Sequence, residues 1–197
     1  MTDSCNFLLA GVGGQGTILA SDVLAEVALA SGLDVKKSEV HGMAQRGGSV
    51  NTHVRWAAGK VYSPLVSEGE ADILLAFEEA EALRYVNYLR QGGVAVVNRQ
   101  AIKPITVSSG GAHYPSEEDL RIVYGRVTDR FYLVPGADLA EELGNARAAN
   151  VVLLGALSSF LDVPAETWLA VIEKRVPPRY LELNRRVFLA GRDAVRG

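Results

Sequence analysis

The sequence predicts an α/β fold, a three-layer αβα sandwich built around a mostly parallel sheet. Short apolar runs at 6–10, 72–77 and 94–98 have the length and composition of strands buried on both faces. Segments with apolar residues at helical spacing lie between and after these runs, and such alternation is typical of layered α/β sheets. With 197 residues, 48% of them hydrophobic, we expect a single domain over residues 1–197.

The N-terminal half is expected to open with a strand, a helix and a second strand, followed by a hairpin. The first strand ends at Gly11, and the helix after it ends at Ser31-Gly32, where glycine commonly terminates a helix. Apolar and polar side chains then alternate, as in a half-exposed strand. The predicted elements are strands at 6–10 and 33–38, a helix at 17–30, a loop at 39–48, and an antiparallel hairpin of strands at 49–56 and 61–66.

The C-terminal half continues the alternation and then becomes entirely helical. Ser116 is placed to cap a helix, because its hydroxyl can accept from a backbone amide of the first turn. The predicted elements are strands at 72–77, 94–98, 105–107 and 131–135, and helices at 78–90, from 116, at 137–143, 146–161, 165–176 and 180–195. The C-terminal helices, over about 146–197, are expected to cover one face of the sheet or to pack on a partner.

Composition and charge exclude several classes of protein. The net charge of −3 argues against a basic nucleic-acid-binding surface. No apolar run approaches the roughly 20 residues of a membrane span, and the N-terminus lacks the basic start of a signal peptide. We therefore expect a cytoplasmic chain that binds neither nucleic acid nor membrane. The single cysteine, Cys5, excludes an internal disulfide and any iron–sulfur cluster held by four cysteines of this chain.

Glycine is abundant, with 20 residues, and its first cluster is the strongest local signal. The string Gly-Val-Gly-Gly-Gln-Gly contains a G-x-G-x-x-G pattern that follows a predicted strand and precedes a helix, the context of a Rossmann-like binding loop. Glycines let the backbone approach a ligand, and the amides of the first helical turn attract an anion. The candidate binding residues here are Gly11, Gly13, Gly14, Gln15 and Gly16.

A second candidate loop follows the second predicted strand. It gathers an imidazole, an amide, a guanidinium and two glycines, and Arg46 could clamp a carboxylate or phosphate. Both loops should lie at the carboxyl edge of the sheet, where open α/β sheets bind ligands. The candidate binding residues here are His41, Gln45, Arg46, Gly47 and Gly48, and no catalytic role is assigned.

The residues alone leave several alternatives open for these loops. They could form an anion site, a tight turn without a ligand, or a dinucleotide site. A dinucleotide site requires an acid near the end of the second strand, but Lys36 and Lys37 occupy the expected place, and Asp34 and Glu39 flank it. Arg46 could equally pair with Glu39.

Other candidates are weaker. His53 and Arg55 are predicted to lie on a solvated strand face. The acids Glu78, Glu79 and Glu81 suit a helix start by their charge. Cys5 is expected to be unreactive. The three histidines lack metal-ligand spacing, so no metal site is predicted.

The two glycine loops together resemble the gamma-type module of the 2-oxoacid:ferredoxin oxidoreductases. The string Ser38–Val50, which contains Gln-Arg-Gly-Gly, is similar in particular to the beta subunit of indolepyruvate:ferredoxin oxidoreductases. The C-terminal helices agree with this pattern at Gly155-Ala156-Leu157, Asn184 and Gly191. The resemblance covers nearly the whole chain.

This resemblance implies an enzyme that decarboxylates an aryl 2-oxoacid on thiamine diphosphate. The resulting intermediate is oxidised through iron–sulfur clusters to ferredoxin, and coenzyme A takes the acyl group. The chain has one cysteine and lacks the Gly-Asp-Gly start of the usual thiamine diphosphate–magnesium motif. The resemblance therefore implies that a larger alpha subunit carries thiamine diphosphate, Mg²⁺ and the clusters. The loops at 11–16 and 39–48 would face that subunit or bound coenzyme A.

Two other functions remain as alternatives: a stand-alone nucleotide- or dinucleotide-binding protein, and an interaction module without catalysis. The apolar C-terminal helices also predict that the isolated chain finds a partner, with a homodimer as one outcome.

Overall fold

The computed structural model describes residues 4–41, 48–103, 107, 110–111 and 113–196, without the side chain of His41. Its centre is a six-stranded sheet with the order β2-β3-β1-β4-β5-β6. All strands run in one direction except β3, which is antiparallel to both of its neighbours. The strands are β1 (Ser4–Val12), β2 (Asp34–His41), β3 (Ser49–Ala57), β4 (Ala71–Ala76), β5 (Leu89–Asn98) and β6 (Phe131–Val134).

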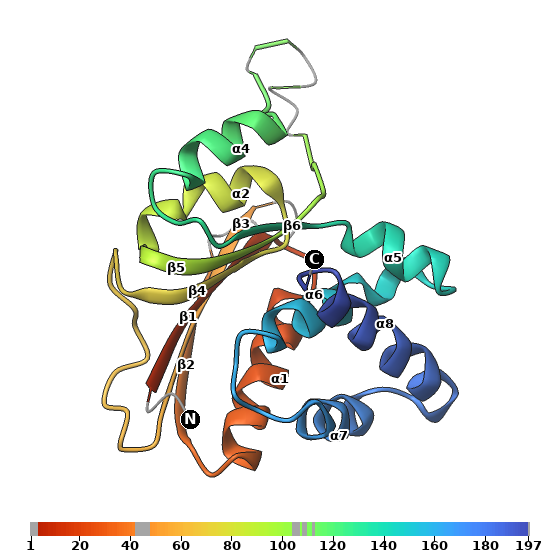
Figure 1. Cartoon of the computed structure of the whole chain (residues 1–197). Helices are drawn as coiled ribbons and strands as arrows, with labels where there is room; N and C mark the ends of the chain where they lie inside the picture. The colour runs from red at the N-terminus through yellow and green to blue at the C-terminus, as the bar shows by residue number, and fades with distance from the viewer. Residues whose placement is uncertain (1–3, 42–47, 104–106, 108–109, 112, 197) are drawn as a thin grey trace.

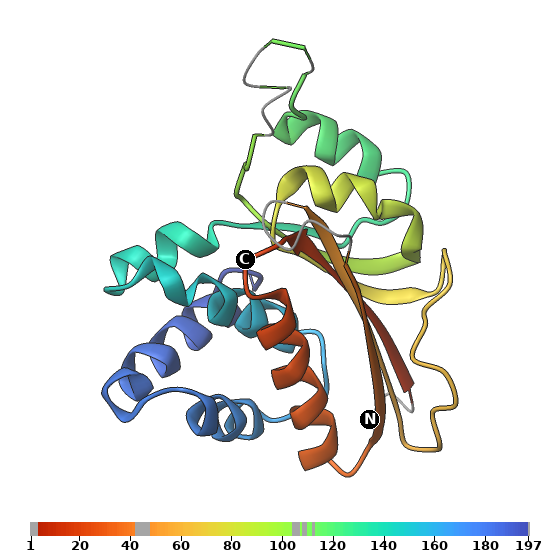
Figure 2. The ribbon, with the colours of Figure 1, turned by 180° about the vertical axis from the view of Figure 1, so that it is seen from behind.

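Helices cover both faces of this sheet, so the predicted three-layer αβα sandwich is confirmed (Figure 1). The C-terminal helices and α1 lie on one face, and α2 and α4 lie on the other, which Figure 2 shows from behind. The helices are α1 (Thr17–Ala30), α2 (Glu79–Arg84), α4 (Glu117–Tyr124), α5 (Gly136–Glu142), α6 (Ala149–Ser158), α7 (Ala165–Arg175) and α8 (Leu181–Asp193), with short 3-10 turns η1 (Val86–Tyr88), η2 (Ala146–Ala148) and η3 (Pro178–Tyr180).

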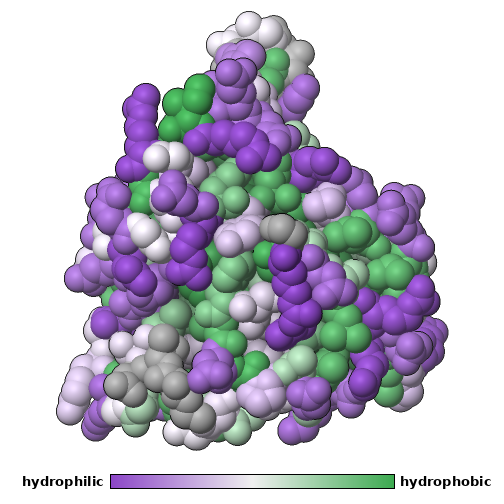
Figure 3. Space-filling model, in the orientation of Figure 1, coloured by the Kyte–Doolittle hydropathy of each residue, from purple (hydrophilic) through white to green (hydrophobic). Residues whose placement is uncertain are grey.

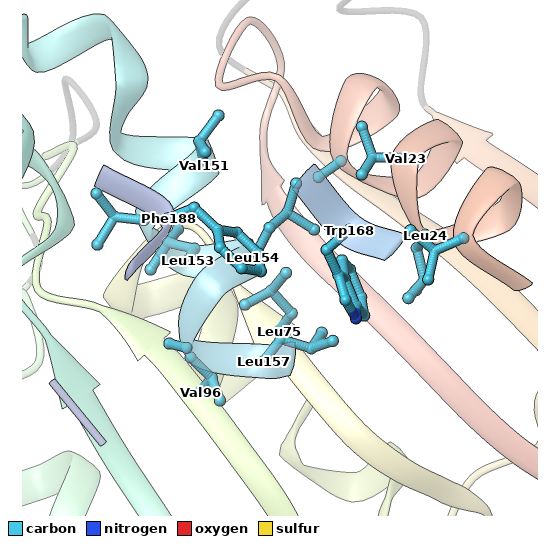
Figure 4. Close-up of a cluster of buried hydrophobic side chains, with 14 of the residues drawn as sticks. Val23, Leu24, Leu75, Val96, Val151, Leu153, Leu154, Leu157, Trp168 and Phe188 are labelled. Atoms are coloured by element: carbon cyan, nitrogen blue, oxygen red, sulfur yellow. The ribbon is translucent and has the colours of Figure 1, made fainter. Parts of the chain in front are cut away.

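The larger hydrophobic core lies between the sheet and the helices α1, α6, α7 and α8. Figure 4 shows Leu75 and Val96 of the sheet facing Leu157 of α6, with Trp168 of α7 beside Leu24 of α1. A smaller cluster lies on the other face, under α2 and α4. The sheet is therefore packed against helices on both of its faces.

Two glycines allow α6 and α8 to cross in direct backbone contact. A Cβ atom on Gly155 would lie 2.0 Å from the carbonyl oxygen of Phe188, and one on Gly191 would lie 1.9 Å from that of Val152. Both distances are far below van der Waals contact, so only glycine fits at either position.

The predicted hairpin is wrong in its second strand. β3 pairs with β2 and β1 on its two edges, so neither edge is left for residues 61–66, which form no strand. Side chains of the sheet accept hydrogen bonds from the backbone of that segment instead. Asp34 accepts the amide of Val61 at 2.8 Å, and His53 accepts the amide of Val66 at 3.1 Å. Pro64 within it has no amide to donate.

The helix predicted at 78–90 is also too long. It ends at Arg84, continues as the turn η1, and gives way to β5 at Leu89. Leu89 is buried and pairs with Ala71 of β4, so sheet pairing overrides the helical pattern. The short strand predicted at 105–107 falls outside the described residues except at Val107, which is helical. None of the described helices combines the length and apolarity needed to cross a membrane.

Candidate functional site

The first glycine loop connects the end of β1 to α1, as predicted; two of its glycines have a backbone that favours glycine, and a third lies close to neighbouring side chains. Gly14 and Gly16 have φ angles of 102° and 83°, in the left-handed region that favours glycine. A Cβ atom on Gly11 would lie 3.0 Å from Oε1 of Gln15 and 3.1 Å from Cβ of Phe77. The chain therefore turns here through a shape that side chains would obstruct.

The two glycine loops meet directly. The amide of Gly13 donates to the carbonyl oxygen of Gly48 at 2.9 Å. His41 ends β2. The predicted site residues Gln45, Arg46 and Gly47 lie outside the described residues, so their assignment as binding residues stays a prediction.

A groove of about 600 Å³ opens beside this meeting point, between the start of α1 and the strands β2 and β3. Its polar end is the first turn of α1, which has no acidic residue and no capping side chain. Backbone amides of a first turn have no partner inside their helix and attract anions. Its apolar wall includes Ile18, Leu19 and Val40, which are 50%, 41% and 47% exposed. The groove thus suits a ligand or partner with both an anionic and an apolar part.

A network of ion pairs forms the far wall of the groove. The Lys37 ammonium contacts the carboxylates of Asp22 and Glu39, both of which line the groove. Burial lowers the pKa of Lys37, but the two hydrogen-bonded carboxylates outweigh this and raise it overall. Arg175 of α7 joins the network through Asp22 at 3.4 Å and Glu26 at 2.5 Å. Glu39 is therefore already paired.

A network of side-chain amides links the segments that follow β1, β4 and β5, beside the glycine loop. Gln15 donates to the carbonyl oxygen of Phe77 at 2.9 Å and to Oε1 of Gln100 at 3.1 Å. Asn98 donates to the same two oxygens at 3.2 and 3.0 Å and accepts the amide of Gly136 at 3.1 Å. Because α1 and α2 leave β1 and β4 on opposite faces, this is the switch point where open α/β sheets hold dinucleotides.

This arrangement disfavours a dinucleotide site. The switch point holds protein amides, and Asp34, one of the two acids available for a ribose, accepts the amide of Val61. The hydrogen bond from the Val61 amide, helped by nearby Lys36, lowers the pKa of Asp34 by more than burial raises it.

Two acids that the sequence suggested only as a favourable helix start are buried. Glu78 is 1% exposed and Glu81 5% exposed. Glu78 caps α2 by accepting the amide of Glu81 at 2.9 Å, and its other oxygen accepts the amide of Ile102 at 3.0 Å and the hydroxyl of Tyr114. Burial and this carboxylate raise the pKa of Tyr114 well above its usual range. The sequence shows only that these acids follow a buried strand, a pattern that does not distinguish buried from exposed carboxylates.

Two weaker candidates have different outcomes. His53 was expected on a solvated face, but it is 5% exposed and accepts the Val66 amide, and burial lowers its pKa. Cys5 is buried in β1, and burial raises the pKa of its thiol far above the usual range, which supports the expectation that it is unreactive. Among the described residues, no group of three or more potential metal ligands gathers.

Comparison with known proteins then identifies the family. Residues 6–194 match the family described as pyruvate ferredoxin/flavodoxin oxidoreductase. The chain belongs to this family. It is 43% identical to the indolepyruvate oxidoreductase subunit IorB of Pyrococcus horikoshii, over 97% of this chain and 96% of that protein. It is 30% identical to the 2-oxoglutarate synthase subunit KorC of Methanothermobacter thermautotrophicus, over 95% and 93% of the two chains.

Solved structures of the family have the same fold. The gamma subunit of a keto/oxoacid ferredoxin oxidoreductase from Geobacter sulfurreducens superimposes with a TM-score of 0.75 at 26% identity, covering 98% of this chain and 96% of that one. The family membership, the α/β fold and the role as an oxidoreductase subunit agree with the resemblance carried by the two glycine loops. The chain is a subunit of a 2-oxoacid:ferredoxin oxidoreductase.

Proposed function

We propose that this chain is the small subunit of an oxidoreductase that acts on an aryl 2-oxoacid, with indolepyruvate as the substrate. The 43% identity to an indolepyruvate oxidoreductase subunit over nearly the full length of both chains carries this proposal. In the overall reaction, the 2-oxoacid anion, coenzyme A and two oxidised ferredoxins give acyl-coenzyme A, CO₂, two reduced ferredoxins and a proton. The bond between the carboxylate and the keto carbon breaks, and a thioester forms.

The donor set of this chain does not fit the cofactors of that reaction. An iron–sulfur cluster takes about four thiolates, and the only cysteine is buried in β1 with its thiol held protonated. We therefore place the clusters on a larger alpha subunit. We place thiamine diphosphate and Mg²⁺ there too, because this chain lacks the Gly-Asp-Gly start of their usual motif, with ferredoxin as the acceptor of the complex. Thiamine diphosphate supplies carbanion stabilisation there.

The groove beside the glycine loops is the proposed contribution of this chain. The start of α1 offers amides to an anion, while Ile18 and Val40 offer an apolar wall. Coenzyme A combines phosphates with a flexible, less polar arm, so we propose that the groove contacts coenzyme A or the larger subunit in the assembled complex. The proposed binding residues are the two loop sets, Gly11, Gly13, Gly14, Gln15 and Gly16 with His41, Gln45, Arg46, Gly47 and Gly48.

The proposal is tested by purification and turnover. Tagged chain from native, anaerobically grown cells should bring down a larger chain that contains thiamine diphosphate and iron. The purified complex should reduce ferredoxin with indolepyruvate and coenzyme A faster than with pyruvate or 2-oxoglutarate. A chain that always purifies alone would refute the subunit assignment, and a preference for another 2-oxoacid would refute the substrate.

The G-x-G-x-x-G pattern favours one alternative to the proposed function, namely a stand-alone dinucleotide-binding protein. The amide network around Gln15 and Asn98 argues against it, since it fills the switch point. Titration calorimetry of the isolated chain with NAD, NADP and FAD is expected to give no saturable heat. Saturable binding of any of them would favour the alternative.

A further inference from the structure

We propose that Gln15 and Glu81 are positioning residues that set the shape of the glycine loop at 11–16 from its two sides. Neither is among the described residues that line the groove, whereas Gly13, Gly14 and Gly16 between them do. The inference rests on the proposed function, since it says how the amides of the groove are held ready for what the groove contacts.

Gln15 fixes the loop from the side of the sheet. Its Oε1 accepts the amide of Val12 at 2.7 Å, so the side chain closes the turn of which it is part. Its Nε2 donates to the carbonyl oxygen of Phe77 and to Gln100. Both ends of this amide are thus used by the protein itself. We therefore assign Gln15, one of the proposed binding residues, an indirect role: it shapes the loop that binds, while the ligand contacts fall to the other members of the set.

Glu81 fixes the loop from the side of α2, through Ser49. The Ser49 hydroxyl donates to Oε2 of Glu81 and lies 3.1 Å from the hydroxyl of Tyr85. Ser49 follows Gly48, whose carbonyl oxygen accepts the amide of Gly13. The contacts therefore run from a buried carboxylate through Ser49 and Gly48 to the middle of the glycine loop. A buried carboxylate gives strong hydrogen bonds, because its charge is weakly screened.

This arrangement pre-organises the groove. The amides at the start of α1 can meet an anion without reordering only if the preceding loop is already in place, and such pre-organisation lowers the cost of binding. Loss of the contacts of either Gln15 or Glu81 should therefore weaken binding at the groove more than it slows the chemistry. The chemistry takes place on another chain in the proposed complex.

The test compares three variants at Glu81 and its neighbour in the assembled complex. Glu81→Ala removes the acceptor of Ser49 and the ion-pair partner of Arg84, whereas Glu81→Gln keeps an oxygen there. Glu79→Gln removes a charge from the same helical turn, one that interacts with Glu78, Glu117 and Arg99. We measure the KM for coenzyme A, the concentration of larger subunit for half-maximal assembly, and kcat. Glu81→Ala should raise one of the two constants about five- to tenfold, by more than it changes kcat. Glu79→Gln should stay within about twofold of the original chain, and Glu81→Gln, which keeps an oxygen but loses the charge, should fall between it and Glu81→Ala.

Hydrogen–deuterium exchange of the isolated chain gives an independent readout. The peptide covering residues 11–18 should exchange faster in Glu81→Ala and in Gln15→Ala than in the original chain or in Glu79→Gln. Unchanged exchange of this peptide, or a fall in melting temperature with both constants unchanged, overturns the inference. If the original chain fails to assemble with any larger subunit, the proposed function is wrong, while the exchange data still decide whether Gln15 and Glu81 position the loop.

Discussion

Substitution of Gly16 by alanine tests the backbone of the glycine loop most simply. Gly16 has a φ of 83°, and a left-handed conformation costs a residue with a side chain about 1–2 kcal/mol. The added Cβ would also lie 2.9 Å from Nδ2 of Asn150, a side chain that can move. We therefore expect the free energy of unfolding to fall by about 1–2 kcal/mol. For a chain of this size that lowers the melting temperature by about 2–8 °C.

The assay is urea unfolding followed by the fluorescence of Trp56 and Trp168, which are both buried. Gly14→Ala has the same backbone problem, with a φ of 102°, but open space around the added atom. The difference between the two variants therefore isolates the contact with Asn150. Gly59→Ala is the matched control, because Gly59 has neither a left-handed backbone nor a neighbour within 4 Å. If Gly16→Ala were as stable as Gly59→Ala, the described loop geometry would be wrong.

Three further predictions follow from the site and the core. Gly155→Ala should destabilise the chain by about 3 kcal/mol or more in the same urea assay, because its Cβ would meet the Phe188 carbonyl at 2.0 Å; a loss below 1 kcal/mol would contradict the close crossing of α6 and α8. His53 has its pKa lowered by burial, so the unfolded chain takes up a proton that the folded chain does not, and stability should fall as the pH drops below about 6.5; His53→Gln should flatten this dependence, and an unchanged slope would count against it. Arg46→Ala should lower the turnover of the assembled complex about tenfold or more with assembly intact; unchanged turnover would favour an interaction module.

The sequence predicted the parts of this fold that depend on local pattern. The apolar strand, the glycine turn and the helix at 17–30 are adjacent in the chain, so the pattern alone located them within a few residues. The alternation at 49–56 also correctly indicated a strand. It carried no information on the partner, however, and β3 pairs with β2 and β1 instead of the segment around Pro64.

The contacts that shape the candidate site could not be predicted from the sequence, for a physical reason. Gln15 bonds with Phe77 and Gln100, which lie 62 and 85 positions away in the chain, and no local pattern records such pairs. Acids at the start of α2 suit the helix dipole whether they are exposed or buried, so the sequence could not reveal that Glu81 is buried against Ser49. Hydrophobic and hydrophilic residues are mixed over the face seen in Figure 3, so surface hydropathy alone does not single out a partner-binding surface.

The central claim is that this chain works only as part of a larger 2-oxoacid:ferredoxin oxidoreductase. The most direct measurement is anaerobic purification of the tagged chain from native cells, followed by analysis of the bound chains, thiamine diphosphate and iron, and by ferredoxin reduction with indolepyruvate and coenzyme A. The account predicts a larger chain that carries both cofactors, and ferredoxin reduction that requires both chains. Recovery of the small chain alone, or full activity of the larger chain without it, would contradict the account.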